Sequence, residues 1–213
     1  MKKKWISLGF LLVGLVSSLH ANHFYLGGGL GLSTVQTCES TSIPSEQHDL
    51  GGFGFTGGGF GGYLFCVPCS KLDCGLELFI NGNTTRNVVK HLFNDARLHV
   101  SSRYNWGVRA LPGYQFNQFI EGHFIVGYVR GHFSAKDGGV YGTLSETFNA
   151  NGFQLGLGST IYCVPCFSIR LDGIYSRYQS RDLDGISTTP SIANSYSFRP
   201  QSFDGTVSLI YNF

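Results

Sequence analysis

The stretch that decides the fold is FDGTVSLIYNF, residues 203–213. Successive residues of a β-strand point to opposite faces, so every second residue shares a face. One face of this stretch is polar apart from Ile210, and the other carries Phe203, Val207, Leu209, Tyr211 and Phe213. A strand that stops on an aromatic residue with no polar tail is unusual in a soluble protein. The pattern therefore predicts a strand whose apolar face meets lipid.

The first 21 residues have the layout of a secretory signal peptide. Three lysines, Lys2 to Lys4, precede an apolar run at residues 5–16, and small and polar residues lead from there to Ala21. The run is shorter than the about 20 residues that a membrane-spanning helix needs. We therefore expect residues 1–21 to be a signal peptide, cleaved within a residue or two of Ala21, and residues 22–213 to form one exported domain.

The composition of the exported part favours a membrane barrel. The full chain has 15 basic and 13 acidic residues, and removing the three lysines leaves 12 against 13, a nearly neutral balance that argues against nucleic acid as a partner. Charged residues make up 13% of the chain, against about 25% in a typical soluble domain. Glycine is abundant, with 30 residues, and aromatics make up 15%. These values fit a β-barrel better than a soluble periplasmic domain.

Alternation of apolar and polar residues recurs along the whole exported part. It predicts eight strands, at residues 23–34, 51–65, 74–84, 98–114, 119–133, 146–162, 167–179 and 203–213. The connections alternate between long polar segments (35–50, 85–97, 134–145, 180–195) and short turns (66–73, 115–118, 163–166). Long loops at one end and short turns at the other are typical of outer-membrane barrels. The sequence predicts an all-β, eight-stranded, antiparallel, up-and-down transmembrane β-barrel.

Two segments carry a family likeness, Leu-Pro-Gly-Tyr-Gln-Phe at 111–116 and Val-Gly-Tyr-Val at 126–129. With the strand layout, they make residues 22–213 resemble the small eight-stranded outer-membrane barrels, such as the transmembrane domain of outer membrane protein A, the X-type barrels and the opacity-type surface antigens. The resemblance implies residence in a Gram-negative outer membrane among lipid and lipopolysaccharide. It also implies that the barrel-assembly machinery reads the C-terminal strand, through Leu209, Tyr211 and Phe213.

Charged residues gather on the faces expected to point inward. Counting from the turns places Glu77, Arg109, Glu121 and Arg170 at one level in the periplasmic half, where they can form a ring of ion pairs. The candidate lumen cluster comprises these four with His123 and Asp172, and Arg103 and Asp204 are further residues expected to face inward. In the resembled family such a cluster plugs the lumen. A gated narrow ion path and catalysis are the alternatives.

The six cysteines are the second candidate feature. Cys-Val-Pro-Cys occurs twice, at Cys66 to Cys69 and at Cys163 to Cys166, each in a predicted periplasmic turn. The two turns lie nearly opposite each other around the barrel rim, so one zinc ion reaches both with difficulty, and no helix start is present for a thioredoxin-like site. We expect two local disulfides, Cys66–Cys69 and Cys163–Cys166, with intermolecular bridges as the alternative. No metal and no cofactor are expected.

The predicted function is that of a non-enzymatic surface barrel, structural or adhesin-like through its extracellular loops, which would contact host or envelope proteins. The first alternative is a small porin or narrow channel. A lipid-modifying outer-membrane enzyme is less favoured, because the outward candidates Ser102 and His132 have no obvious acid beside them. A soluble lipocalin-like barrel would require the apolar faces to point inward.

Overall fold

A computed structural model of the chain describes residues 22–40, 49–67, 70–90, 97–139, 142–164, 166–183 and 196–213. The signal peptide expected at 1–21 lies outside the described residues. The described chain forms ten strands, all paired antiparallel: β1 (His23–Ser40), β2 (Asp49–Cys66), β3 (Leu72–Asn83), β4 (Arg86–Lys90), β5 (Arg97–Gln115), β6 (Ile120–Gly139), β7 (Gly142–Val164), β8 (Phe167–Tyr178), β9 (Arg181–Leu183) and β10 (Tyr196–Asn212).

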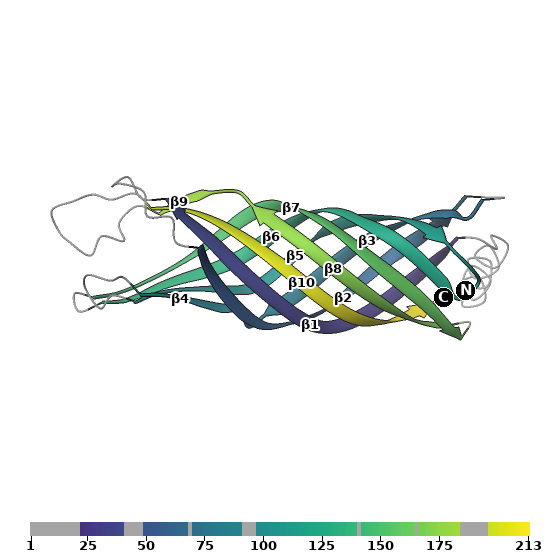
Figure 1. Cartoon of the computed structure of the whole chain (residues 1–213), viewed down its shortest axis with the longest axis horizontal. Coiled ribbons are helices and arrows are strands. Elements are labelled where there is room, and N and C mark those ends of the chain that lie inside the picture. The colour runs from purple at the N-terminus through teal and green to yellow at the C-terminus, as the bar shows by residue number, and fades with distance from the viewer. Residues whose placement is uncertain are drawn as a thin grey trace, which may run out of the picture.

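Eight of these strands close into a barrel. They pair in the order β1, β2, β3, β5, β6, β7, β8 and β10, and β10 pairs back onto β1 in a register that runs from Tyr25 opposite Asn212 to Ser40 opposite Ser197. The short strands β4 and β9 add to β5 and β10 near the same end of the barrel (Figure 1). The predicted eight-stranded antiparallel barrel is confirmed.

The two ends of the barrel differ. The connections β2–β3, β5–β6 and β7–β8 are short and lie at the end where β10 finishes, whereas the opposite end carries the additional short strands β4 and β9 (Figure 1). We call these the turn end and the loop end. This asymmetry is the one that outer-membrane barrels show between their periplasmic and extracellular sides.

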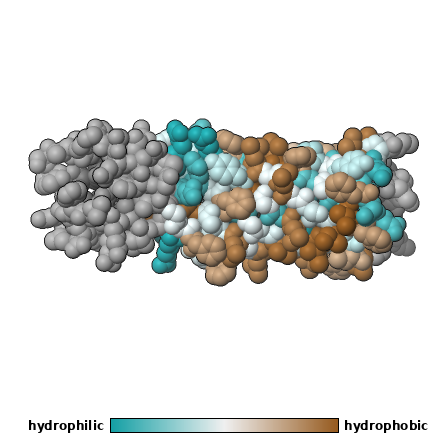
Figure 2. All heavy atoms as spheres, viewed as in Figure 1, coloured by the Kyte–Doolittle hydropathy of each residue, from teal (hydrophilic) through white to brown (hydrophobic). Residues whose placement is uncertain are grey.

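Polarity is inverted relative to a soluble protein. Along β8 exposed and buried residues alternate almost without exception, and the buried set contains Ser168, Arg170, Asp172 and Ser176. Large apolar residues stand outside on every barrel strand, among them Leu30, Phe55, Leu78, Val108, Phe124, Leu157, Leu171 and Leu209. They form a hydrophobic belt, bordered by hydrophilic residues toward the loop end (Figure 2). No helix in the described part of the chain is long and apolar enough to cross a membrane.

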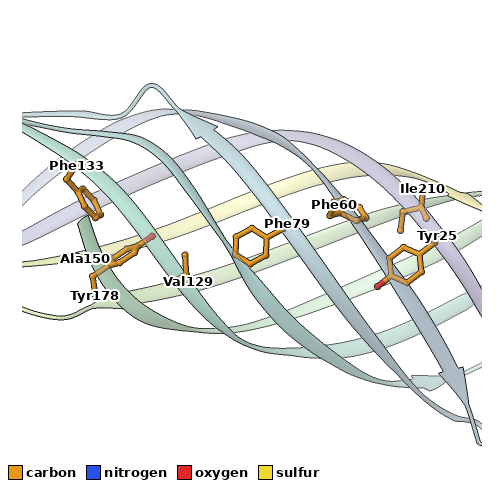
Figure 3. Close-up of a cluster of buried hydrophobic side chains, with 8 residues drawn as sticks. All are labelled: Tyr25, Phe60, Phe79, Val129, Phe133, Ala150, Tyr178 and Ile210. Carbon is orange, nitrogen blue, oxygen red and sulfur yellow. The ribbon is translucent and has the colours of Figure 1, made fainter. Parts of the chain in front are cut away.

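The interior is narrow and filled. Side chains from Phe133 at one end through Val129 and Phe79 to Tyr25 at the other follow one another along the inside of the barrel (Figure 3). Inward glycines allow this crowding: a Cβ on Gly31 would collide with the carbonyl oxygen of Gly205, and one on Gly58 with that of Ile80. An eight-stranded barrel has just enough interior for side chains, and here they occupy it.

Aromatic rings gather at the turn end. Phe24, Tyr63 and Phe65 stack edge to face, with ring centroids 4.7 and 4.6 Å apart. On the other side of the β1–β10 seam, Tyr211 makes similar contacts with Phe167 and Phe213, at 5.2 and 4.8 Å. Rings in this position are typical of the interfacial girdles of membrane barrels.

Several predicted strand boundaries were wrong. The residues expected to form loops at 35–50, 85–97 and 134–145 partly continue the strands, because β1 runs to Ser40, β4 occupies Arg86–Lys90 and β6 runs to Gly139. In these extensions exposed positions are polar, such as Gln36 and Lys136, so the apolar outer face that marks a membrane strand in sequence is missing although the backbone pairing continues.

Arg103 does not face inward, contrary to the sequence prediction. The β5–β6 register shifts between Ser102 and Tyr104, which is a β-bulge with Arg103 as the extra residue. Arg103 is therefore exposed, whereas Ser102, expected outside, is buried at 5% exposure. Strict period-two counting fails wherever a strand carries one extra residue.

Candidate functional site

Glu77, on β3, is the centre of the buried charge cluster. Its carboxylate forms an ion pair with Arg109 on the neighbouring strand β5, directly opposite it in the register. From the far side of the lumen Arg170 Nη1 approaches Glu77 Oε2 at 2.7 Å, and the Tyr25 hydroxyl donates to the same oxygen at 3.2 Å. The Glu77 side chain is fully shielded from solvent, so both guanidiniums reach it in a low-dielectric interior.

The cluster continues from Arg170 to residues of β8 and β6. Arg170 Nε lies 2.9 Å from Asp172 Oδ2, and the other oxygen of Asp172 lies 3.0 Å from His123 Nε2. The opposite ring nitrogen of His123 lies 3.8 Å from Glu121, whose second oxygen accepts a hydrogen bond from the Tyr162 hydroxyl. Acidic and basic residues thus alternate across the lumen.

Aromatic rings close the space around the guanidiniums. The Arg170 guanidinium carbon lies 4.0 Å from the centroid of the Phe60 ring, and that of Arg109 lies 4.8 Å from Phe79. These cation–π contacts stabilise the buried guanidinium charges. Between the cluster and the turn end lies a cavity of about 30 Å³, lined by Glu121, His123 and Arg170 among others, which has room for a water molecule.

All six residues proposed from sequence for the lumen cluster meet in this arrangement: Glu77, Arg109, Glu121, His123, Arg170 and Asp172. They do not lie on one level, since Glu121 is nearer the turn end and reaches the others through His123. Tyr25, Phe60, Phe79 and Tyr162 belong to the site and were not proposed. The only signal for them was an aromatic residue on an inward face, as Phe60 shows among the glycines of β2.

No disulfide is found among the four cysteines whose side chains the structure describes. Cys66, Cys74, Cys163 and Cys166 are free, and Cys69 lies outside the described residues. The expected Cys163–Cys166 bridge is therefore absent from the structure. Val164 pairs with Phe167, and the register shift before it makes Cys163 an irregular strand position, with its thiol directed to the Ile161 carbonyl oxygen at 3.7 Å. Because Cys66 is free, the structure does not contain the expected Cys66–Cys69 bridge either.

The other two sequence proposals concern the C-terminal strand and a catalytic pair. Leu209, Tyr211 and Phe213 all stand on the outer face, and the Phe213 amide donates to the Phe24 carbonyl oxygen at 3.0 Å. Ser102 and His132 lie on opposite faces of the wall, with His132 stacked on Tyr104 outside, so this serine and histidine are not a nucleophile and its base. Among the described residues no group of three His, Cys, Asp or Glu is placed to hold a metal ion.

Comparison with known proteins identifies the fold. No protein-family model and no curated protein matches the sequence. Among solved structures, the outer membrane protein OprG of Pseudomonas aeruginosa superposes with a TM-score of 0.52 at 12% identity, covering 91% of this chain and 97% of that one. Neisserial surface protein A gives 0.48 at 14% identity (89% and 97%), and Ail of Yersinia pestis, solved with the heparin analogue sucrose octasulfate, gives 0.47 at 15% (90% and 99%).

The closed antiparallel wall, the outward apolar belt and the likeness to OprG define the class. The chain has the fold of the small eight-stranded outer-membrane β-barrels. At 12% identity this likeness concerns the fold and carries no ligand or partner with it.

Proposed function

We propose that the protein is an integral outer-membrane β-barrel with a plugged polar lumen, which serves as a structural or adhesin-like surface protein through its loop end. The apolar belt supports the membrane location. Leu30 is 75% exposed, Leu78 66% and Phe124 63%. A soluble monomer does not expose large apolar side chains to this extent all the way around its surface. In a bilayer the same residues are solvated by acyl chains.

The single observation that carries the plugged lumen is the burial of the ion-pair cluster. Glu77, Arg109 and Arg170 are each 6% exposed or less, and every one of them contacts an opposite charge. In a water-filled pore such groups would be hydrated and exposed. Their mutual pairing and the contacts with Phe60 and Phe79 support a lumen that is closed at this level.

Conductance across a planar bilayer tests this proposal. We expect the reconstituted wild-type barrel to give no reproducible openings of porin size. The Arg109→Met variant removes one of the two guanidiniums that pair with Glu77 and so weakens the ion-pair cluster. It serves as the comparison in which we expect openings. Large, reproducible openings from the wild type that disappear on changing Glu77 or Arg109 would contradict the plugged lumen.

A narrow channel is the second candidate, and the cavity at the turn end favours it. The cavity lies beside His123 and Arg170, so water that enters from the turn end reaches the side of the ion-pair cluster that faces this end. A conducting path through the barrel then requires only that Glu77 exchange its ion-pair partners Arg109 and Arg170. Small cation currents in the wild type, lost when Glu77 is changed to Gln, would favour this second function over the first.

The remaining parts of the proposal concern partners and chemistry. We propose that lipid and lipopolysaccharide surround the belt, that the barrel-assembly machinery recognises the strand ending in Phe213, and that host or envelope proteins meet the loop end. A non-enzymatic role is supported by the separation of Ser102 from His132. A lipocalin-like carrier requires apolar faces that point into the barrel, whereas the apolar faces of this barrel point outward.

A further inference from the structure

Asp204, on β10, is a buried carboxylate that the ion-pair cluster does not use. It is 6% exposed, and its Oδ1 has no hydrogen-bond partner in the described chain. Its Oδ2 accepts a hydrogen bond from the Ser202 hydroxyl at 3.4 Å. Glu77 and Asp172 each contact a guanidinium, whereas no described Lys, Arg or His lies within ion-pair distance of Asp204.

The charges inside the barrel do not balance. The buried titratable residues of the described chain comprise four acids and three bases: Glu77, Glu121, Asp172 and Asp204 against Arg109, Arg170 and His123. Even with His123 protonated, four negative charges face three positive ones, which leaves one negative charge unmatched. A buried charge without a counter-charge is costly, so something must neutralise it.

The surroundings of Asp204 are rich in hydroxyl groups. Ser33 on β1 lies directly opposite it in the register and is 1% exposed, and Ser202 and Thr206 flank it on the same face of β10. A further buried hydroxyl group is that of Tyr178, which reaches into the lumen (Figure 3). These hydroxyls donate to a carboxylate and keep lone pairs free for a cation.

We propose that the barrel holds one monovalent cation, such as Na⁺, on the Asp204 carboxylate with hydroxyl oxygens of Ser33 and Ser202 as further ligands. Oδ2 of Asp204 accepts the hydrogen bond from Ser202, while Oδ1 has no hydrogen-bond partner in the described chain, so that side of the carboxylate is free to bind a cation. Oxygen ligands suit hard cations, and a single carboxylate balances a single positive charge. The ion is resident, so this proposal does not depend on whether the lumen conducts.

Thermal unfolding of the full chain in detergent tests the site. Folded and unfolded fractions are separated by heat-modifiable migration, in sodium chloride and in N-methyl-D-glucamine chloride at equal ionic strength, because the organic cation is too large to enter. For a site with a dissociation constant of ~10 mM, ~100 mM Na⁺ lowers the unfolding equilibrium constant about tenfold. We expect wild type to show this difference and Asp204→Asn, which has no charge to neutralise, to show none.

Two further variants keep the test decisive. Ser33→Ala retains the carboxylate and removes one ligand, so we expect its sodium effect to shrink while the fold persists. Glu146→Gln changes an exposed carboxylate on β7 and should behave as wild type. Coincident unfolding curves of wild type in the two salts would overturn the proposal and assign the neutralisation to a proton on Asp204. A sodium effect that survives in Asp204→Asn would overturn it as well.

Discussion

Changing Glu77 to Gln removes the one carboxylate that lies between two buried guanidiniums. The amide keeps the size of the side chain and can still accept from the Tyr25 hydroxyl, which stands 3.2 Å away. It cannot balance Arg109 and Arg170, which are 6% and 2% exposed. Breaking a buried ion pair by removing one partner costs about 3–5 kcal/mol, and here Arg170 keeps Asp172 while Arg109 keeps no described counter-charge.

We therefore expect Glu77→Gln to lower the free energy of unfolding by about 3–5 kcal/mol, mainly through Arg109. Urea unfolding followed by the fluorescence of Trp106, which stands on the outer face of β5, measures this change. Adding Arg109→Met in the same chain removes the orphaned charge and should recover much of the loss, which identifies the electrostatic cause.

The matched control is Glu146→Gln, an exposed carboxylate on β7 whose loss should cost well under 1 kcal/mol. Equal destabilisation by Glu77→Gln and Glu146→Gln would refute the reasoning. So would a double variant, Glu77→Gln with Arg109→Met, whose two effects simply add.

Three further outcomes are expected. Gly31→Ala should destabilise the barrel strongly, because the new Cβ would collide with the carbonyl oxygen of Gly205. Gly28→Ala, on the outer face, should be neutral or stabilising by about 0.5–1 kcal/mol, because the nearest atom to its Cβ is 3.5 Å away. Chemical unfolding of the two variants checks this difference. Deleting Phe213 should lower the yield of assembled barrel in cells more than it changes the unfolding of barrels already assembled, and an unchanged yield would exclude the assembly signal. Cys163 and Cys166 should both take up a thiol-specific alkylating reagent, and mass spectrometry that found them mutually bridged would contradict the free thiols.

The general architecture could be predicted from sequence because a lipid-facing wall imposes strict alternation. Eight segments obeyed it, and the same alternation placed Glu77, Arg109 and Arg170 inside. The alternation could not predict which of them meet, since Arg170 is 93 residues from Glu77 and approaches it across the lumen. Contacts of this kind depend on strand register and barrel closure, which no local pattern encodes.

Arg103 and the hairpin arms show where alternation fails. A bulge adds one residue without any local signal in composition, so it exchanges the faces of Ser102 and Arg103. In its extension to Ser40, β1 exposes polar residues such as Gln36, and the sequence pattern alone predicted a loop there. The sequence is therefore informative where lipid selects an apolar outer face and weak where the outer face is polar.

The most direct test of the central claim, that the belt faces lipid around a filled lumen, is quenching of Trp106 by brominated acyl chains. In a Trp5→Phe chain Trp106 is the only tryptophan, and it is 45% exposed on the outer face of β5. We predict strong quenching by bromine carried on the acyl chains of the bilayer, and little by a water-soluble quencher. Tryptophan fluorescence that the brominated lipid leaves unchanged would contradict the account.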